Sequence, residues 1–453
     1  MKIQLWSAVA TASLCAGFVI PSQETLKELV TDDTEPSYSD LQTPDYETAP
    51  YIHHLDAVLD SFTDCDDDDL FFYDPVDDDD EDYYPELDDD DDYYYYPEDL
   101  PPLHPPHHPP SDKTIYELIS ESKYTTVLAK IVNEDDDLVN LLNSTKSNHT
   151  FFAPTDAAFE KIPHHPHQKP PAEIIRAVAK YHLVPGLWDA THVFHSHTLP
   201  TELEDPALNS LPQRLAIRVG WKGLTVNFYS RIVATDIKGS NGIIHGIDSI
   251  LVPPPSTLAI LNIIPTLFST TVLALQKTNL TELLTSNNHG GTLFAPSNKA
   301  FEKLGFKLNA FLFSPYGTKY LRALLKYHIV PDRTLYSDIF YTEKGEGRPF
   351  GVKGYTHLDL PTLLPGKEVA VDVVTLGPYA SLKVNGFRDV AVSDLLAKDG
   401  SVQVLDRVLI PPKEETEEDW VEEFMTVEEL KSRLEDYLDG EKEEFEWPHE
   451  TEL

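Results

Sequence analysis

Cysteine is nearly absent from this chain of 453 residues, which contains two. Cys15 lies in an N-terminal apolar run that we expect to be removed. Cys65 stands among aspartates, whose negative charge disfavours the reactive thiolate. A disulfide framework is therefore excluded for the mature monomer, and no cysteine is available as a nucleophile. The folded part must depend on a hydrophobic core, for which about 300 residues are sufficient.

Basic residues are also scarce, with 35 Lys and Arg against 77 Asp and Glu. The imbalance is confined to the two ends of the chain. Residues 112–412 carry 29 acidic and 29 basic side chains, whereas residues 24–111 carry 30 acids and one lysine, and residues 413–453 carry 18 acids and four bases. This pattern predicts a neutral globular centre with two acidic flanks. Nucleic acid is not an expected partner, because phosphate binding needs clustered Lys and Arg.

Long apolar runs are missing except at the N-terminus. There, one lysine precedes an uncharged apolar run that ends in small residues, so we predict a signal peptide over residues 1–20. A membrane anchor of marginal length is the alternative. After removal of the signal, no membrane span is expected. Three N-x-S/T sequons, at Asn143, Asn148 and Asn279, fit a secreted glycoprotein.

The acidic flanks have the composition of disordered segments. Asp64–Asp99 holds 20 acids and no base, and its self-repulsion opposes compaction, so residues 21–111 are predicted to be disordered up to and including a Pro/His-rich spacer. The tail, residues 413–453, is predicted to hold one short helix. Its signs are a capping box that starts at Thr426, and Leu430, Leu434 and Leu438 at helical spacing.

Between the flanks, one set of motifs is written twice. TFFAPTDAAF at 150–159 returns as TLFAPSNKAF at 292–301, KYHLVPG at 180–186 returns as KYHIVPD at 326–332, and NGIIHGIDSILVPP at 241–254 returns as DGSVQVLDRVLIPP at 399–412. The order is kept while the spacing grows, which indicates additional loop residues in the second copy. We therefore predict two domains of one fold, residues 112–254 and 255–412.

Within each copy, helices precede strands, which predicts an α+β fold. The Pro that follows each short apolar pair should end a strand, and the next residue, Thr155 or Ser297, should cap a helix. Alternating segments later in each copy predict the remaining strands. The expected helices are Thr114–Ile131, Ala172–Tyr181, Pro265–Leu284 and Lys319–Tyr327.

These three motifs, in this order and twice over, resemble the fasciclin-like domain family. The resemblance implies two tandem domains, each a wedge of two β-sheets with flanking helices, and a role in extracellular or cell-surface adhesion. The acidic flanks make the chain most similar to fungal members. The second copy departs from the family pattern, because Asp399 replaces the Asn and Gln403 stands where the first copy has His245.

In animal members, the resemblance implies adhesion contacts at the Tyr-His pair and at an Asp-Ile pair before the last strand. The residues that correspond here are Tyr181, His182, Tyr327, His328, Asp236, Ile237, Asp394 and Leu395. Fungi lack integrins, so those contacts need not be adhesive here. The alternative is structural. A histidine at a helix C-terminus can bond the last carbonyls, an aspartate before a turn can cap it, and His245 can face either the core or the surface.

No metal site, cofactor or catalytic motif is expected. The histidine clusters at 104–108 and 164–167 lie in Pro-rich loops without the spacing of a fixed metal site. No nucleophile elbow, zinc-protease helix, P-loop or dinucleotide fingerprint occurs. We predict a non-catalytic secreted or cell-surface adhesion protein that binds an unidentified matrix or cell-wall protein or glycan. The alternative is a soluble resident of the vacuole lumen, or of another secretory compartment, without an adhesive role.

Overall fold

The computed structural model describes residues 111–162, 170–220, 223–286, 289–342, 344–350, 353–386, 388–412 and 425–438. All of these belong to one compact unit of the chain. The predicted signal peptide, both cysteines, the acidic N-terminal segment, both histidine clusters and most of the acidic tail lie outside the described residues. Within the described residues, no helix has the length and apolar character needed to cross a membrane.

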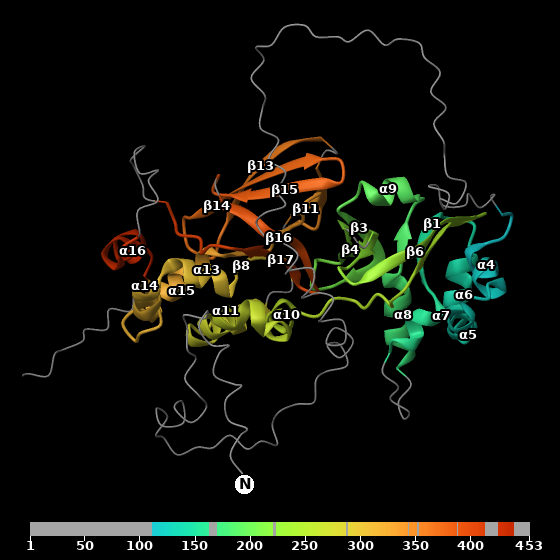
Figure 1. Ribbon diagram of the computed structural model, residues 1–453, viewed down its shortest axis with the longest axis horizontal. Helices are drawn as coiled ribbons and strands as arrows, with labels where there is room; N and C mark the ends of the chain where they lie inside the picture. Colours follow the sequence, from blue (N-terminus) through green and yellow to red (C-terminus); the bar gives the residue numbers. More distant parts are fainter. Residues whose placement is uncertain are drawn as a thin grey trace, which may run out of the picture. The chain divides into compact units, whose positions relative to one another are not determined.

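Among the described residues, the first repeat contains six helices and seven strands. Figure 1 draws this repeat in cyan to yellow-green. Its helices are α4 (Ile115–Glu121), α5 (Thr126–Asn133), α6 (Asp136–Asn143), α7 (Asp156–Glu160), α8 (Ala172–Tyr181) and α9 (Ala190–Phe194). Its strands are β1 (His149–Pro154), β2 (Leu183–Pro185), β3 (Thr198–Asp205), β4 (Leu211–Gly220), β5 (Gly223–Val226), β6 (Ser230–Gly239) and β7 (Gly242–Ile247).

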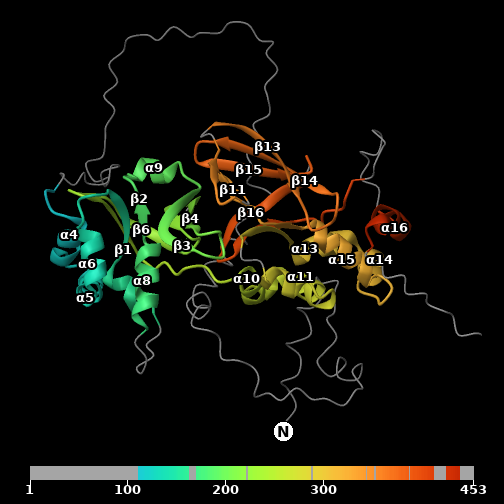
Figure 2. The same ribbon diagram turned by 180° about the vertical axis from the view of Figure 1, so that it is seen from behind.

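The second repeat follows the same order with an insertion (Figure 2). Its helices are α10 (Thr257–Ile263), α11 (Pro265–Lys277), α12 (Thr281–Ser286), α13 (Asn298–Leu304), α14 (Phe306–Leu312), α15 (Thr318–Tyr327) and α16 (Val427–Leu434), with a 3-10 turn at Glu435–Tyr437. Its strands are β8 (Gly291–Pro296), β9 (Ile329–Pro331), β10 (Thr334–Leu335), β11 (Ile339–Tyr341), β12 (Gly347–Pro349), β13 (Lys353–Pro361), β14 (Glu368–Leu376), β15 (Tyr379–Val384), β16 (Arg388–Ala397) and β17 (Gly400–Leu405).

Both repeats build the same sheet. The strand order is β2-β1-β7-β6-β5-β4-β3 in the first and β9-β8-β17-β16-β15-β14-β13 in the second. The first and last strands of each repeat, β1 with β7 and β8 with β17, pair in parallel, and all other neighbours pair antiparallel. The inserted strands β10, β11 and β12 form a small separate sheet, which contributes to the wider spacing between the second and third motifs of the second copy. The α+β prediction is confirmed.

Each seven-stranded sheet folds over on itself. In the first repeat, Leu199 of β3 and Leu215 of β4 pack in one cluster with Phe152 of β1 and Ile247 of β7. The turn of the sheet lies along β6, where the pairing with β7 shifts register twice. β16 has the same two shifts against β17. Bulges of this kind bend a strand and increase its twist, so they produce the predicted wedge.

Two predicted helices are each divided in the structure. The segment Thr114–Ile131 forms α4 and α5, and Pro265–Leu284 forms α11 and α12. The second break lies at Asn279, which has φ 53° and so leaves the helical region. The predicted helix caps hold in part, because Ser297 accepts the N–H of Ala300, whereas Thr155 donates its hydroxyl to the carbonyl of Ile247.

The predicted helix of the tail is α16, and it belongs to the core of the second repeat. Thr426 accepts the N–H of Glu429 as its N-cap. Leu430 and Leu434 are buried in the cluster that contains the second sheet and its helices, and Leu438 packs against it half-buried. An acidic flank therefore carries a segment that completes a hydrophobic core.

Candidate functional site: two copies of a bulged strand

The Tyr-His pairs lie in the core. Tyr181, His182, Tyr327 and His328 are all buried, at 2% exposure or less. A partner of the folded protein cannot reach side chains at this depth. The adhesion contacts expected at these four residues stay a prediction, and the structural alternative accounts for their burial.

Both histidines use their two ring nitrogens inside the fold. His182 donates from Nδ1 to the carbonyl of Val178, 2.8 Å away, and accepts the N–H of Leu251 at Nε2, 2.9 Å away. His328 makes the same pair of bonds with Leu324 and Leu409. This arrangement requires the neutral ring. Burial lowers the pKa of both histidines to about 4.

The tyrosines tie the pair to the facing half of the sheet. The Tyr181 hydroxyl donates to the carbonyl of Arg214 at 2.9 Å and accepts the side-chain amide of Asn227. The amide oxygen of Asn227 in turn accepts the N–H of Ala216. Asn385 repeats this role between Tyr327 and Ala370. Each Tyr-His pair therefore joins the two halves of its own wedge.

The pairs Asp236-Ile237 and Asp394-Leu395 lie at the second register shift of β6 and β16. Asp236 and Asp394 both have φ 57°, a left-handed conformation in which aspartate is among the commoner non-glycine residues. Their backbone N–H groups point at the last strand of the repeat. Asp236 donates there to Nδ1 of His245, and Asp394 donates to Oε1 of Gln403.

Gln403 makes the same two types of hydrogen bond in the second repeat that His245 makes in the first. His245 donates from Nε2 to the carbonyl of Trp188 at 2.8 Å, and Gln403 donates from Nε2 to the carbonyl of Leu335 at 2.8 Å. Both side chains are fully buried and supply one acceptor and one donor at the same spacing. Burial lowers the pKa of His245, which keeps its ring neutral. The open question from the sequence is settled, since His245 faces the core.

In the second repeat, the bulge is closed by the first repeat. The carboxylate of Asp394 accepts the N–H and the hydroxyl of Ser337 at 2.7 and 2.5 Å and has no exposed surface. Arg218 of β4 bonds the carbonyl of Ser393 and lies 3.6 Å from Asp394. Leu395 is buried as well. Asp394 therefore lies in a joint between the two repeats, and the adhesion contact expected at Asp394 and Leu395 stays a prediction.

A second arginine extends this joint. Arg214 is buried and lies 3.6 Å from Asp338, and it donates to the hydroxyl of Tyr341 at 3.2 Å. Asp338 also accepts the N–H and hydroxyl of Thr198 at 2.8 and 2.6 Å. Ala216 packs beside these groups with apolar side chains of the second repeat. Buried charges need partners of this kind to remain charged.

In the first repeat, the same bulge is not covered among the described residues. Asp236 and Ile237 are half-buried, and Asp236 accepts the N–H of Ala190 at the start of α9 at 2.9 Å. Ala190 occupies the position of Ser337, so the second carboxylate oxygen of Asp236 has no hydrogen-bond partner among the described residues. Asp236-Ile237 and Asp394-Leu395 therefore differ in how accessible they are among the described residues.

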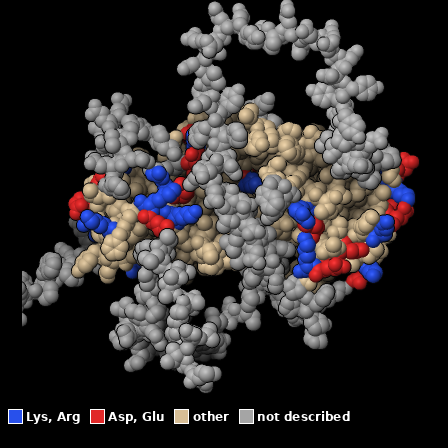
Figure 3. All heavy atoms as spheres, in the orientation of Figure 1, with Lys and Arg blue, Asp and Glu red and all other residues tan. Residues whose placement is uncertain are grey.

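The three sequon asparagines are placed where glycans could be attached. Asn143 at the end of α6, Asn148 before β1 and Asn279 after α11 are all exposed. On the face shown in Figure 3, basic and acidic side chains of the described residues are intermingled, as expected for the neutral centre.

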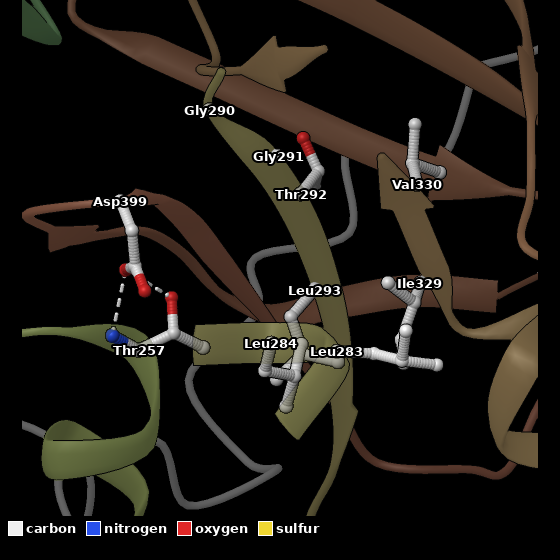
Figure 4. Close-up of a pocket in the computed structure, with 10 residues that line it drawn as sticks. All are labelled: Thr257, Leu283, Leu284, Gly290, Gly291, Thr292, Leu293, Ile329, Val330 and Asp399. Atoms are coloured by element: carbon white, nitrogen blue, oxygen red, sulfur yellow. Dashed lines mark hydrogen bonds between the residues drawn. The ribbon is translucent and has the colours of Figure 1, made fainter. Parts of the chain in front are cut away.

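The pocket shown in Figure 4 is small, with a cavity volume of about 20 Å³, which is the scale of one water molecule. Its acid, Asp399, accepts both the N–H and the hydroxyl of Thr257 at 2.7 Å. Asp399 thus fixes the start of α10, as Asn241 fixes the start of α4 by accepting the N–H of Ile115. Among the described residues, no group of three potential metal ligands gathers.

Sequence reasoning missed the residues that close the joint, namely Arg214, Arg218 and Asp338. No motif contains them. The one available signal was weak, since two arginines four residues apart in an alternating strand point to the same face.

Comparison with known proteins agrees with this geometry. The family model described as "Fasciclin domain" matches residues 123–253 and 266–411. The chain belongs to the fasciclin domain family. Its repeats are therefore two fasciclin domains, as the motif order predicted.

The similar proteins include fungal ones. Aurofusarin biosynthesis cluster protein S of Gibberella zeae is 28% identical over 72% of this chain and 86% of its own length. A fasciclin-like arabinogalactan protein of Phaeosphaeria nodorum is 24% identical over 60% and 81%. The solved domain pair of the insect cell adhesion molecule Fasciclin I covers 65% of this chain and 95% of its own, with 17% identity and a TM-score of 0.30.

Proposed function

We propose that this protein is a non-catalytic interaction protein of the secretory route that binds a matrix or cell-wall protein or glycan through the Asp236 bulge of its first repeat. The observation that carries the proposal is the difference between the two bulges. Asp394 is enclosed at the joint between the two repeats, whereas Asp236 is half-buried and one of its carboxylate oxygens has no partner among the described residues. A carboxylate oxygen without a partner among the described residues offers a charged contact, while the neighbouring Ile237 packs half-buried against the core of the first repeat.

The family supports an interaction role rather than catalysis. Fasciclin domains are shared with transforming growth factor-beta-induced protein ig-h3 of Oryctolagus cuniculus, 27% identical over 59% of this chain and 34% of its own length. The predicted signal peptide and the exposed sequons support delivery to the cell surface or the medium. The alternative is a soluble resident of the vacuole lumen or of another secretory compartment. Imaging a tagged chain separates the two, since a luminal signal with an empty medium favours the resident.

Retention on insoluble wall or matrix material tests the binding proposal. Asp236→Lys reverses the charge at the open bulge and should reduce retention of the purified chain at least tenfold. Glu302→Lys changes the charge equally at another exposed acid, in α13, and should leave retention unchanged. Equal retention of the wild-type chain and Asp236→Lys would contradict the proposal.

A second candidate keeps the site and changes the partner. The fungal relative with the widest coverage above is described as a biosynthesis cluster protein, which favours a biosynthetic protein as the partner. A photo-crosslinking residue in place of exposed Lys238, next to Ile237, would identify what lies against the bulge. Recovery of wall or matrix material supports the first candidate, and recovery of an enzyme supports the second.

A further inference from the structure

The joint between the repeats has two sides that can be defined separately. One side, here called the arginine face, is the outward row of β4, namely Arg214, Ala216 and Arg218. The other side, here called the aspartate bulge, is the backbone and carboxylate of Ser393–Asp394 in β16. Arg218 reaches both the Ser393 carbonyl and the Asp394 carboxylate. Because the chain contains two copies of one domain, each side of the joint has a counterpart in the other domain.

The second aspartate bulge is at Thr235–Asp236. Its equivalence to Ser393–Asp394 rests on shared φ values of 57° and shared bonds from the bulge N–H to the last strand. Among the described residues, neither a guanidinium nor a hydroxyl bonds the second oxygen of Asp236. This bulge therefore has the shape of the closed one without its occupant.

The second copy of the arginine face lies on β14, and its charge is reversed. Asn227 and Asn385 accept the N–H groups of Ala216 and Ala370, so these two alanines correspond. Two residues before and after them, Glu368 and Asp372 take the places of Arg214 and Arg218. Ala370 is half-buried and Glu368 is exposed, whereas Ala216 and Arg214 are buried in the joint.

This reversal decides which partner fits the open bulge. A second copy of the chain would bring the carboxylates of Glu368 and Asp372 toward Asp236, and like charges placed together oppose association. Its own arginine face is already used inside the molecule. Growth of the chain by head-to-tail contacts is therefore disfavoured, and a partner with an arginine is needed.

We propose that the Asp236 bulge receives the arginine face of a fasciclin-type domain on a different protein, in the way that the Asp394 bulge receives Arg218. The proposal rests on the proposed function and names its partner as a protein with an arginine at the position of Arg218. An arginine satisfies the site because its planar group can bond the carbonyl of Thr235 and the carboxylate of Asp236 together. The association is charge-dependent and weakens as salt is added.

The test converts this chain into its own partner. In the variant Asp236→Asn/Glu368→Arg/Asp372→Arg, the open bulge is neutralised and an arginine face is created on β14. Mixed with the wild-type chain, it should form a one-to-one complex in sedimentation velocity, and raising the salt should dissociate it. The Asp236→Asn chain replaces wild type as the matched control and should give at least tenfold weaker complex formation.

Two outcomes overturn the inference. One is the absence of a complex when the triple variant melts at the wild-type temperature. The other is a complex that forms equally well with the Asp236→Asn chain.

Asp372 accepts bonds from Tyr355 and His357 at 2.6 Å, so a second variant, Asp236→Asn/Glu368→Arg, keeps these contacts if the triple variant does not fold. Absence of a complex with that folded variant would also overturn the inference. Loss of wall retention in Asp236→Lys together with no complex here would leave the proposed function standing and remove only its partner.

Discussion

His182 and His328 place an acid-sensitive group at the centre of each domain. Each is neutral because Nε2 must accept a backbone N–H, and protonation of that nitrogen would replace an acceptor with a donor. The tyrosine beside each histidine is fixed by an asparagine on the opposite half of the wedge. The motif that most resembles a contact site is therefore part of the folding core of both domains.

These histidines predict acid lability. Their folded pKa of about 4 lies below the ordinary value of 6.5, so the neutral form stabilises the fold. This stabilisation is fully present above pH 6.5 and is lost as the pH falls from 6.5 toward 4. At pH 4.5 the loss should be roughly 2 to 3 kcal/mol for each histidine. Urea unfolding at pH 7 and pH 4.5 measures it.

His182→Gln is the informative variant for that measurement. It removes one titrating group, so the difference in unfolding free energy between the two pH values should shrink by the share of one histidine. An unchanged pH difference in this variant would show that other groups cause the acid lability.

At the same scale, the sequence predicted some residue roles and missed others. The bond from a histidine to the last carbonyls of its helix was predicted, since both partners lie within four residues. The burial of Asp394 was not, because Ser337 lies 57 residues from it in the chain and Arg218 lies 175 residues before Ser393. Local patterns do not encode a contact of that range when no motif marks either partner.

At the scale of elements, the glycine that opens each last strand is set by the parallel pairing. A Cβ on Gly242 would lie 2.0 Å from the carbonyl oxygen of His149, and one on Gly400 would lie 2.1 Å from that of Gly291. Both copies of the motif therefore have glycine at this position because the first and last strands of each repeat approach closely there.

Gly242→Ala should destabilise the first domain by about 2 kcal/mol or more, because backbone on both sides must shift to admit the methyl group. Gly220→Ala is the control, since a Cβ there meets nothing within 4 Å. Thermal unfolding of both variants checks this. Equal melting temperatures would show that the strands separate more easily than their register implies.

The C-terminal helix α16 should be needed for the stability of the second domain. Leu434 is fully buried against its core, so Leu434→Ala should cost about 2 to 5 kcal/mol. Glu428→Ala, at an exposed position of the same helix, should change stability by less than about 0.5 kcal/mol. Denaturant unfolding compares them, and a neutral Leu434→Ala would mean that the helix docks without contributing.

Elements were predicted well where a local signal existed. The capping box and leucine spacing located α16, and Ala172–Tyr181 matches α8 throughout. The packing of α16 could not be predicted, because an acidic tail gives no sign of the apolar groove that receives it. The inserted sheet β10-β11-β12 was missed for a similar reason, since its strands are only two or three residues long.

At the scale of the molecule, the buried joint should make the two domains unfold together. Removing one member of a buried charge pair typically costs about 3 to 5 kcal/mol. Arg214→Ala should therefore separate the unfolding of the domains into two calorimetric transitions. Arg231→Ala removes an ion pair between the exposed Arg231 and Asp248 inside the first domain and should leave one transition. Two transitions in the wild type would contradict the joint.

We infer that the two aspartate bulges have divided their roles, one joining the domains and the other facing a partner. Carbodiimide labelling of carboxylates in the intact protein, read by mass spectrometry, tests this directly. Asp236 should be modified readily while Asp394 stays unmodified, and Arg214→Ala/Arg218→Ala should make Asp394 reactive. Equal labelling of Asp236 and Asp394 in the wild-type chain would contradict it.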